Sequence, residues 1–260
     1  MTTARPAAVA GLFYPAQKAT LERAVSELLA AAPAGDDLVK AIIAPHAGYV
    51  YSGPTAAHAY RSFEGRRERI RRVVLLGPAH RAYLQGMALP SVDAFSTPLG
   101  DVALDAEGIK QALELPGTQI SDEAHADEHS LEVHLPFQQT VLNDFVLIPI
   151  VVGICPAHEV QAVLEALWGG DETAIVVSSD LSHFHAYDEA RAIDTSTTAS
   201  IEARDATLQG AEACGAHAVN GLLLVAKARG LDVRTLDVRN SGDTAGDKSR
   251  VVGYGSYALA

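Results

Sequence analysis

Three short apolar runs constrain this sequence more than any other feature. They cover residues 41–44, 72–76 and 174–178, and none of them shows a regular alternation of apolar and polar residues. Continuous apolar runs of this length, bounded by turn residues, are typical of strands that are buried on both faces. Because helical patterns fill the intervals between the runs, the sequence predicts βαβ units and a parallel sheet.

Polar, titratable side chains follow each run at the point where the strand should end. His46 follows the first run, His80 follows the second, and Asp180 and His183 follow the third. The carboxyl ends of parallel strands lie at one edge of a sheet, and open α/β sheets bind their ligands there. We therefore expect these four side chains to converge in one crevice. The alternative is that each histidine only forms hydrogen bonds within its own loop.

The rest of the chain continues the alternation of strands and helices. Further strands are expected over 87–90 and 101–105, as a hairpin or an excursion at the sheet edge, and Pro54 should lie near the start of its helix, where its missing N–H costs least. We predict an α/β fold, a three-layer α/β/α sandwich with a largely parallel, mixed central sheet, formed by a single domain over residues 1–260. The expected helices are residues 16–32, 54–63, 106–113, 158–168, 188–208 and 216–228, and the remaining strands are 145–152, 232–238 and 250–259.

Composition narrows the classes of partner and compartment. The 260 residues include 32 acidic and 20 basic side chains, for a net charge of -12. No basic stripe is present that could replace phosphate counterions, which argues against a nucleic-acid partner. Two cysteines, Cys155 and Cys214, are too few for a disulfide framework and favour a reducing, cytoplasmic location. No apolar run approaches the length of a membrane span, so we expect no membrane association.

His46 and His80 are the first candidate metal ligands. About one βαβ crossover separates them, so they belong on adjacent or near-adjacent strands. Neutral imidazole is the commonest metal ligand, and two rings at one sheet edge form half of a site. Cys214 stands before Gly215 at the start of a helix, where the helix dipole lowers the pKa of a thiol and favours a thiolate. In the alternative interpretation, the two histidines cap backbone groups in their loops and Cys214 packs as a small buried hydrophobic residue.

Asp180 and His183 suggest acid–base chemistry. Three positions apart on a tight loop or a first helical turn, the two side chains can lie on the same side of the chain. A carboxylate beside an imidazole orients the ring and raises its basicity, as a general acid–base pair requires. The alternative makes Asp180 the N-cap of a helix that starts at Leu181, and both interpretations can hold together.

His129 and His134 form a second histidine pair on a predicted helical segment. Five helical residues turn the chain so that the two side chains lie roughly 140 degrees apart. They cannot share a metal ion from one regular helix. One of them could face the crevice while the other packs in the core or caps a backbone group.

Several longer motifs carry a resemblance to a known family. They are AGLFYP at 10–15, APHAGY at 44–49, YSG at 51–53, LGPAH at 76–80, DEHSLEVHLPF at 127–137, SSDLSH at 178–183 and CG at 214–215. In this order, and over nearly the whole chain, they resemble the Memo family, known in prokaryotes as AmmeMemoRadiSam system protein B.

The resemblance implies a fold like that of the class III extradiol ring-cleaving dioxygenases, which hold non-haem iron in a crevice at the strand ends. By that likeness His46 and His80 take the places of the two histidine ligands, and Cys214 falls where those enzymes carry a glutamate ligand. His183 falls at the place of the acid–base histidine, with Asp180 beside it. A thiolate is softer than a carboxylate and accepts copper(I) or zinc as well as iron.

The expected function is that of a metal-binding redox enzyme, with iron or copper and alternatively zinc, acting on an unknown small molecule. Two alternatives remain open. The first is a non-catalytic module that binds a peptide or protein in the same crevice, with Tyr49, Tyr51 and Phe184 as aromatic walls. The second is a metal-dependent hydrolase with water at an open coordination position. The resemblance also implies an AMMECR1-like protein and a radical SAM enzyme as partners.

Overall fold

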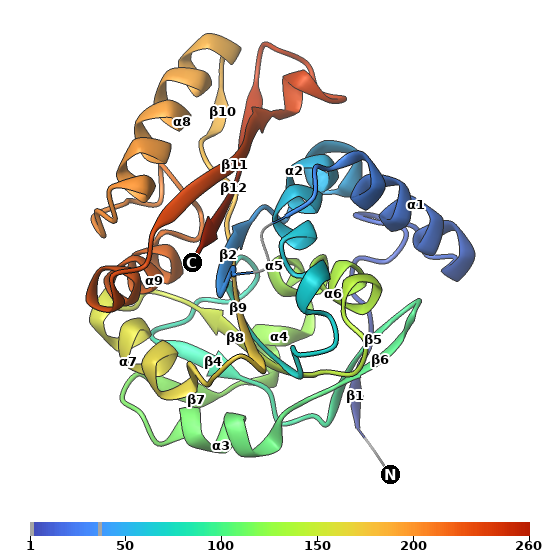
Figure 1. Cartoon of the computed structure of the whole chain (residues 1–260), viewed down its shortest axis with the longest axis vertical. Helices are drawn as coiled ribbons and strands as arrows, with labels where there is room; N and C mark the ends of the chain where they lie inside the picture. The colour runs from blue at the N-terminus through green and yellow to red at the C-terminus, as the bar shows by residue number, and fades with distance from the viewer. Residues whose placement is uncertain (1–2, 36–37) are drawn as a thin grey trace.

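The computed structural model describes residues 3–35 and 38–260 of the chain (Figure 1). Its main structural element is a long mixed sheet, in which β11 (Val233–Asn240) pairs with β12 (Val251–Leu259). The other strands are, in spatial order, β10 (His183–His185), β12 (Val251–Leu259), β2 (Ala41–Ala44), β9 (Thr173–Ser178), β3 (Arg72–Pro78), β8 (Val146–Val152), β4 (Met87–Leu89) and β7 (Thr118–Ile120).

Four neighbouring strands form the parallel centre of this sheet. β9 lies between β2 and β3, so that Val177 pairs with Ile43 on one side and with Leu76 on the other. β8 pairs in parallel with the far side of β3, whereas β4 is antiparallel to β8 and β12 is antiparallel to β2. The three predicted strands are therefore neighbours, and their carboxyl ends lie at one edge of a mixed sheet.

Helices cover both faces of the sheet (Figure 1). Alternate strand residues enter two separate cores, so that Ile42 and Val73 pack in one and Ile43 and Val74 in the other. This arrangement confirms the three-layer α/β sandwich. Among the described residues, no helix is long and apolar enough to cross a membrane. The first core includes α1 (Lys18–Ala31), α2 (Tyr49–Arg61) and α6 (Leu135–Val141), and the second includes α3 (Ala106–Leu113), α7 (Ala157–Leu167) and α9 (Ala216–Arg229).

A small sheet stands apart from the main one. In the described part of the chain it consists of β1 (Ala4–Arg5), β5 (Ala94–Thr97) and β6 (Gly100–Ala103), in the order β1-β5-β6. The hairpin expected from residues 87–90 and 101–105 is formed instead between β5 and β6. β4 does not take part in it, because it is hydrogen-bonded to β8 and β7 within the main sheet.

The second helix begins earlier than its proline suggests. α2 starts at Tyr49, so Pro54 lies inside the helix rather than near its first position. Two contacts fix this start: the backbone N–H of Tyr49 donates to the carbonyl of Phe13 at 2.8 Å, and its hydroxyl donates to the carbonyl of Val133 at 2.7 Å. Tertiary anchoring of the first turn therefore outweighs the local preference of proline for a helix start.

Helix α8 (Tyr187–Glu202) ends before the predicted limit at Leu208. The backbone of Arg204 adopts a left-handed conformation with φ of 56°, which stops the helical path. Its guanidinium Nη1 donates to the carbonyl of Leu231 at 2.8 Å. This contact ties the segment after α8 to the segment that follows α9 (Ala216–Arg229).

A buried ion pair joins the N-terminal segment to α5 (His129–Glu132). Arg5 Nη1 donates to Glu132 Oε2 at 2.7 Å, and both side chains are buried. Glu132 also accepts the hydroxyl of Tyr14 at 2.6 Å, and Arg5 Nη2 donates to the backbone carbonyl of Glu128 at 2.7 Å. Because both charges are hydrogen-bonded, the pair can be buried without a large net cost.

Replacing Arg5 by Ala should destabilise the protein strongly, because it leaves the Glu132 carboxylate buried and unpaired. We expect a loss of about 3–5 kcal/mol in the free energy of unfolding, measured by urea denaturation. Lys18→Ala, which removes the exposed pair of Lys18 with Glu22, is the matched control and should change stability little. Equal effects of the two substitutions would contradict this assignment.

Candidate metal centre

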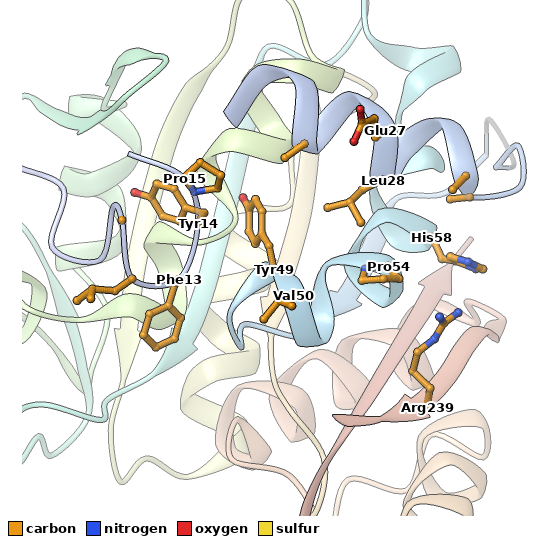
Figure 2. A pocket seen from close by; sticks show the side chains of 15 residues that line it. Phe13, Tyr14, Pro15, Glu27, Leu28, Tyr49, Val50, Pro54, His58 and Arg239 are labelled. Carbon is orange, nitrogen blue, oxygen red and sulfur yellow. The ribbon is translucent and has the colours of Figure 1, made fainter. Parts of the chain in front are cut away.

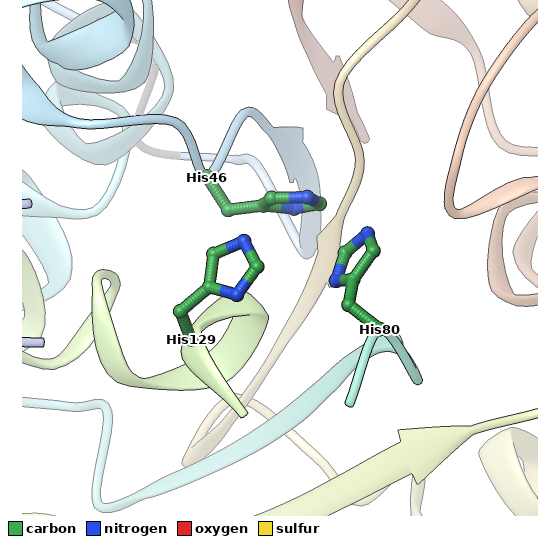
Figure 3. Close-up of side chains that lie close together, drawn as sticks. All are labelled: His46, His80 and His129. Atoms are coloured by element: carbon green, nitrogen blue, oxygen red, sulfur yellow. The ribbon is translucent and has the colours of Figure 1, made fainter. Parts of the chain in front are cut away.

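Three histidines from different elements meet at the carboxyl edge of the sheet. His46 follows β2, His80 follows β3, and His129 begins α5. One ring nitrogen of each lies within 4.8 Å of the others. The ring centroids are 5.1 Å apart for His46 and His80, 5.5 Å for His46 and His129, and 4.8 Å for His80 and His129. Figure 3 shows the three side chains pointing toward one another.

A chain of hydrogen bonds fixes the ring of His46. Its Nδ1 lies 2.6 Å from Ser178 Oγ, and that hydroxyl donates to the carbonyl of Ser130 at 2.7 Å. Because the single hydroxyl proton is used on the carbonyl, Ser178 accepts the Nδ1 proton of His46. The lone pair of the His46 ring is therefore on Nε2, the atom available to a metal.

The buried carboxylate of Glu128 holds the ring of His80 and lies beside the ring of His129. Its Oε1 lies 3.0 Å from His80 Nδ1 and 3.4 Å from His129 Nδ1, and its Oε2 accepts the backbone N–H of His80 at 2.6 Å. Burial alone would raise the pKa of Glu128, but hydrogen bonds from His80 and Ser130 outweigh it and lower the pKa to about 2. The ionised carboxylate favours a proton on His80 Nδ1, which leaves the His80 Nε2 lone pair for ligation. The buried Nδ1 of His129 lies beside the same carboxylate but makes no hydrogen bond within the described residues.

Two glycines allow the segments that carry site residues to approach the sheet. A Cβ on Gly77 would lie 2.8 Å from the side chain of Leu131 in α5, and a Cβ on Gly215 would lie 2.5 Å from the backbone of β9. A larger residue at Gly215 would meet backbone and push its segment away from β9, so this glycine keeps Cys214 close to the strand end. A larger residue at Gly77 would instead require the side chains of Leu131 and Ser130 in α5 to shift.

Burial makes two of the rings neutral at pH 7. It lowers the pKa of His46 well below its ordinary value, with the neighbouring histidines adding to the effect. It also lowers the pKa of His129 to about 4. Buried imidazoles that offer lone pairs without positive charge are the donor type that first-row transition metals take. The cluster of His46, His80 and His129 could therefore hold a metal ion.

Cys214 lies beside the cluster and contacts the ring of His46. Its Sγ is 3.4 Å from His46 Nε2 and accepts the backbone N–H of Asp180 at 3.3 Å. It precedes the N-cap of α9, as predicted, but burial and the Asp180 charge raise the pKa of the thiol. The expected lowering by the helix dipole is wrong, because loss of water around the sulfur outweighs it. A thiolate here needs a cation beside it.

Asp180 and His183 lie on the segment that leaves β9. Residues 179–182 form a loop, so the N-cap alternative for Asp180 is wrong. The carboxylate of Asp180 accepts the backbone N–H of His46 at 2.8 Å, and burial raises its pKa. His183 Nδ1 lies 2.8 Å from the carbonyl of Leu181, so its ring is oriented by the backbone rather than by a hydrogen bond to Asp180. Its Nε2 then carries the lone pair.

A crevice of about 450 Å³ opens beside the cluster. His129, Asp180 and His183 line it, together with Tyr51 and Arg250. A small ligand in this crevice would therefore contact the histidine cluster and the predicted acid–base residues at once. Of the four side chains expected from the strand ends, Asp180 and His183 line the crevice, whereas His46 and His80 belong to the adjoining cluster and Cys214 contacts His46.

A larger cavity of about 650 Å³ lies between α1, α2 and residues 11–15, and Figure 2 shows its lining. Phe13 lines both this cavity and the crevice. The larger cavity contains no member of the histidine cluster, and its one arginine, Arg239, is bonded through two nitrogens to Asp237 at 2.7 and 2.8 Å. Size alone therefore does not identify the chemical centre.

Comparison with known proteins decides the family. The family model for Memo, described as Memo-like protein, matches residues 5–258 of this chain. A MEMO1 family protein of Aquifex aeolicus (strain VF5) is 37% identical over 265 residues, covering 96% of this chain and 97% of its own. A MEMO1 family protein of Archaeoglobus fulgidus is 34% identical over 259 residues, with 95% of each chain covered. The chain belongs to the Memo family.

A solved structure supports the fold of this Memo-family protein. The uncharacterized protein JW3007 from Escherichia coli K12 superposes with a TM-score of 0.55 at 15% sequence identity, covering 85% of this chain and 100% of that one. At this identity the likeness shows the fold alone. The relation to class III dioxygenases therefore remains a prediction.

His129 is the cluster member that was not singled out from sequence as a ligand. Helical spacing predicts that His129 and His134 face different directions, and they do, although they lie on two helices: His129 begins α5, whereas His134 precedes α6. His134 is buried, with Nδ1 2.9 Å from the hydroxyl of Tyr60. The spacing does not show which of the two histidines faces the crevice. The signal that could have found it is Glu128, an acidic residue directly before His129 that can orient a ligating imidazole.

Replacing Glu128 by Gln should weaken metal binding by about 10- to 100-fold, because a neutral amide orients the ligating imidazole of His80 less strongly than an ionised carboxylate does. The dissociation constant for zinc, measured by competition with a chromophoric chelator, checks this. Glu123→Gln, an exposed acidic residue of α4 (Asp122–Ala126), is the matched control and should bind zinc like the wild type. Unchanged affinity in Glu128→Gln would remove Glu128 from the metal centre.

Proposed function

We propose that this Memo-family protein is a metal-dependent redox protein that acts on a small molecule in the crevice. The observation that supports this most directly is the cluster of His46, His80 and His129, which adjoins a crevice lined by His129, Asp180 and His183. A metal centre beside a ligand-sized cavity with titratable walls is the usual arrangement of a metalloenzyme.

The donor set favours a first-row transition metal. His46, His80 and His129 supply nitrogen, and Cys214 can complete the set from the side of His46 as a thiolate. Imidazole suits iron, copper and zinc, and the thiolate favours copper(I) and zinc further, so we propose iron or copper with zinc as the alternative. A redox metal held here would supply electron transfer and polarise a ligand oxygen.

The residues of the chain would bind the ligand and move protons. His183 keeps its Nδ1–H on the carbonyl of Leu181, so its Nε2 lone pair is the one that could accept a proton from a ligand in the crevice. The buried carboxylate of Asp180 fixes the His46 backbone and lies close enough to His183 to interact with it electrostatically. We propose His183 as the general acid–base group and Asp180 as its charged neighbour.

Metal analysis of the purified protein tests the proposal. After reconstitution with iron, copper or zinc, the wild type should retain about one metal ion per chain, and His46→Ala/His80→Ala should retain almost none, because two of the proposed ligands are lost. His158→Ala, an exposed histidine of α7, is the control and should behave as wild type. Equal retention in all three proteins would refute the metal centre.

Proton release on metal binding tests the role of Cys214. Because the pKa of His46 and of His129 is lowered, those rings are already neutral at pH 7 and release nothing, whereas the thiol of Cys214 must lose its proton to bind. Calorimetry in buffers of different ionisation enthalpy should show about one proton fewer released by Cys214→Ser than by the wild type. Identical release would mean that the sulfur is not a ligand.

A second candidate function is peptide binding in the same crevice without a reaction. It is favoured by Tyr51, which lines the crevice at 38% relative exposure. Phe184, at 60% relative exposure, lies outside the lining and contacts it only through Arg250 and His183. Tyr49 cannot join them as an aromatic wall, because its ring is buried and its hydroxyl is bonded to Val133. Such binding would persist when the proposed metal ligands are removed.

A further inference from the structure

We infer that the crevice binds an anionic ligand, a small carboxylate or phosphate, whose charged group is held by Arg250 beside His183. The inference rests on the proposed function, because it takes the same crevice as the ligand site. It is carried by the juxtaposition of an unpaired guanidinium, an aromatic ring held in an unusual backbone conformation, and the proposed acid–base histidine.

Arg250 is an exposed residue that lines the crevice together with Asp180 and His183. Other arginines of the surface, such as Arg72 and Arg239, lie within ion-pair distance of carboxylates. Across residues 3–35 and 38–260, by contrast, Arg250 has a ring contact and no carboxylate partner. Its five N–H donors therefore remain available, and their planar arrangement matches the two oxygens of a carboxylate or phosphate.

Phe184 positions the guanidinium of Arg250. The guanidinium carbon lies 4.4 Å from the centroid of the Phe184 ring, and that ring lies 5.6 Å from the ring of His183. A cation stacked on an aromatic face is stabilised there while its N–H edge stays free. An anionic group bound at this edge is consequently placed next to the acid–base histidine.

The backbone at Phe184 is shaped for this placement. Its φ of 65° lies in the left-handed region, which is costly for an aromatic residue. The pairing of β10 with β12 shifts register between His183 and His185, so Phe184 occupies an irregularity of the ladder. Such bulges re-aim a side chain beside a site. Here the irregularity turns the Phe184 ring toward Arg250, the residue directly before β12.

Because carboxylates surround the crevice, anion binding there should depend on Arg250. The protein carries a net charge of -12, and Asp180 and Asp247 both line the crevice. Among the described residues of the lining, Arg250 is the one lysine or arginine. An anion entering the crevice is repelled by the two carboxylates, so its binding should depend on Arg250, whereas a neutral ligand of the same shape should not.

Isothermal titration of the metal-free full chain with three probes tests the inference: benzoate, phenyl phosphate and neutral benzamide. We expect the wild type to bind one or both anions more tightly than benzamide, and the relative affinity of the two anions distinguishes a carboxylate site from a phosphate site. Arg250→Gln should weaken anion binding about tenfold, as expected for loss of a charge-assisted hydrogen bond, and leave benzamide within about twofold.

Three further variants sharpen the test. Arg229→Gln removes a guanidinium that stacks on Trp168 at 4.7 Å, far along α9, and should leave all three affinities unchanged. Asp247→Asn removes a crevice carboxylate and should strengthen anion binding. Arg250→Lys keeps the charge but loses the planar fork, so its anion affinity should fall between those of the wild type and Arg250→Gln.

The inference is overturned if the wild type shows no preference for either anion over benzamide. It is equally overturned if Arg250→Gln binds the anions as the wild type does, or loses benzamide to the same extent. Zinc stoichiometry, measured on the same samples, tests the proposed metal centre independently of the anion site. An anion preference that depends on Arg250 in a protein that binds no zinc would uphold the anion site while refuting the metal centre.

Discussion

The carboxylate of Glu128 is the interaction on which the metal centre depends. It is almost completely buried, yet its pKa is lowered because His80 and Ser130 donate to it from two different segments. A buried charge without such partners would be strongly destabilising. Here the charge joins the loop after β3 to the start of α5 and orients the ring of His80 beside that of His129. Arg5 donates to the backbone carbonyl of Glu128, so the N-terminal segment also holds Glu128 in place.

The rest of the architecture explains why these side chains meet at all. β2, β9 and β3 are neighbours in parallel register, so the loops after them emerge at one edge. The segment after β9 then crosses to β12, where the N–H of Leu181 donates to the carbonyl of Gly253 at 2.8 Å. This crossing places Asp180 and His183 over the end of β2, beside His46. The site is thus held by strand ends and short hydrogen-bonded loops, which favours a preorganised geometry.

Sequence reasoning was most successful where local pattern and global topology agree. The three apolar runs identified the central strands, and the rule for parallel strand ends brought His46 and His80 together. It failed where distant contacts decide. The role of His129 depends on a four-residue helix packed against Gly77, and no local period reveals that packing. The pKa of Cys214 likewise depends on burial by the whole fold, whereas the sequence shows only the nearby helix start.

The most direct test of the central claim is X-ray absorption spectroscopy of the zinc-loaded protein at the zinc edge. The account predicts imidazole nitrogens at about 2.0–2.1 Å, visible through the multiple scattering of the rings, together with one sulfur at about 2.3 Å. The imidazole signal should decrease in His129→Ala, and the sulfur should vanish in Cys214→Ser. A shell of oxygen atoms alone, or a spectrum that neither substitution changes, would contradict the account.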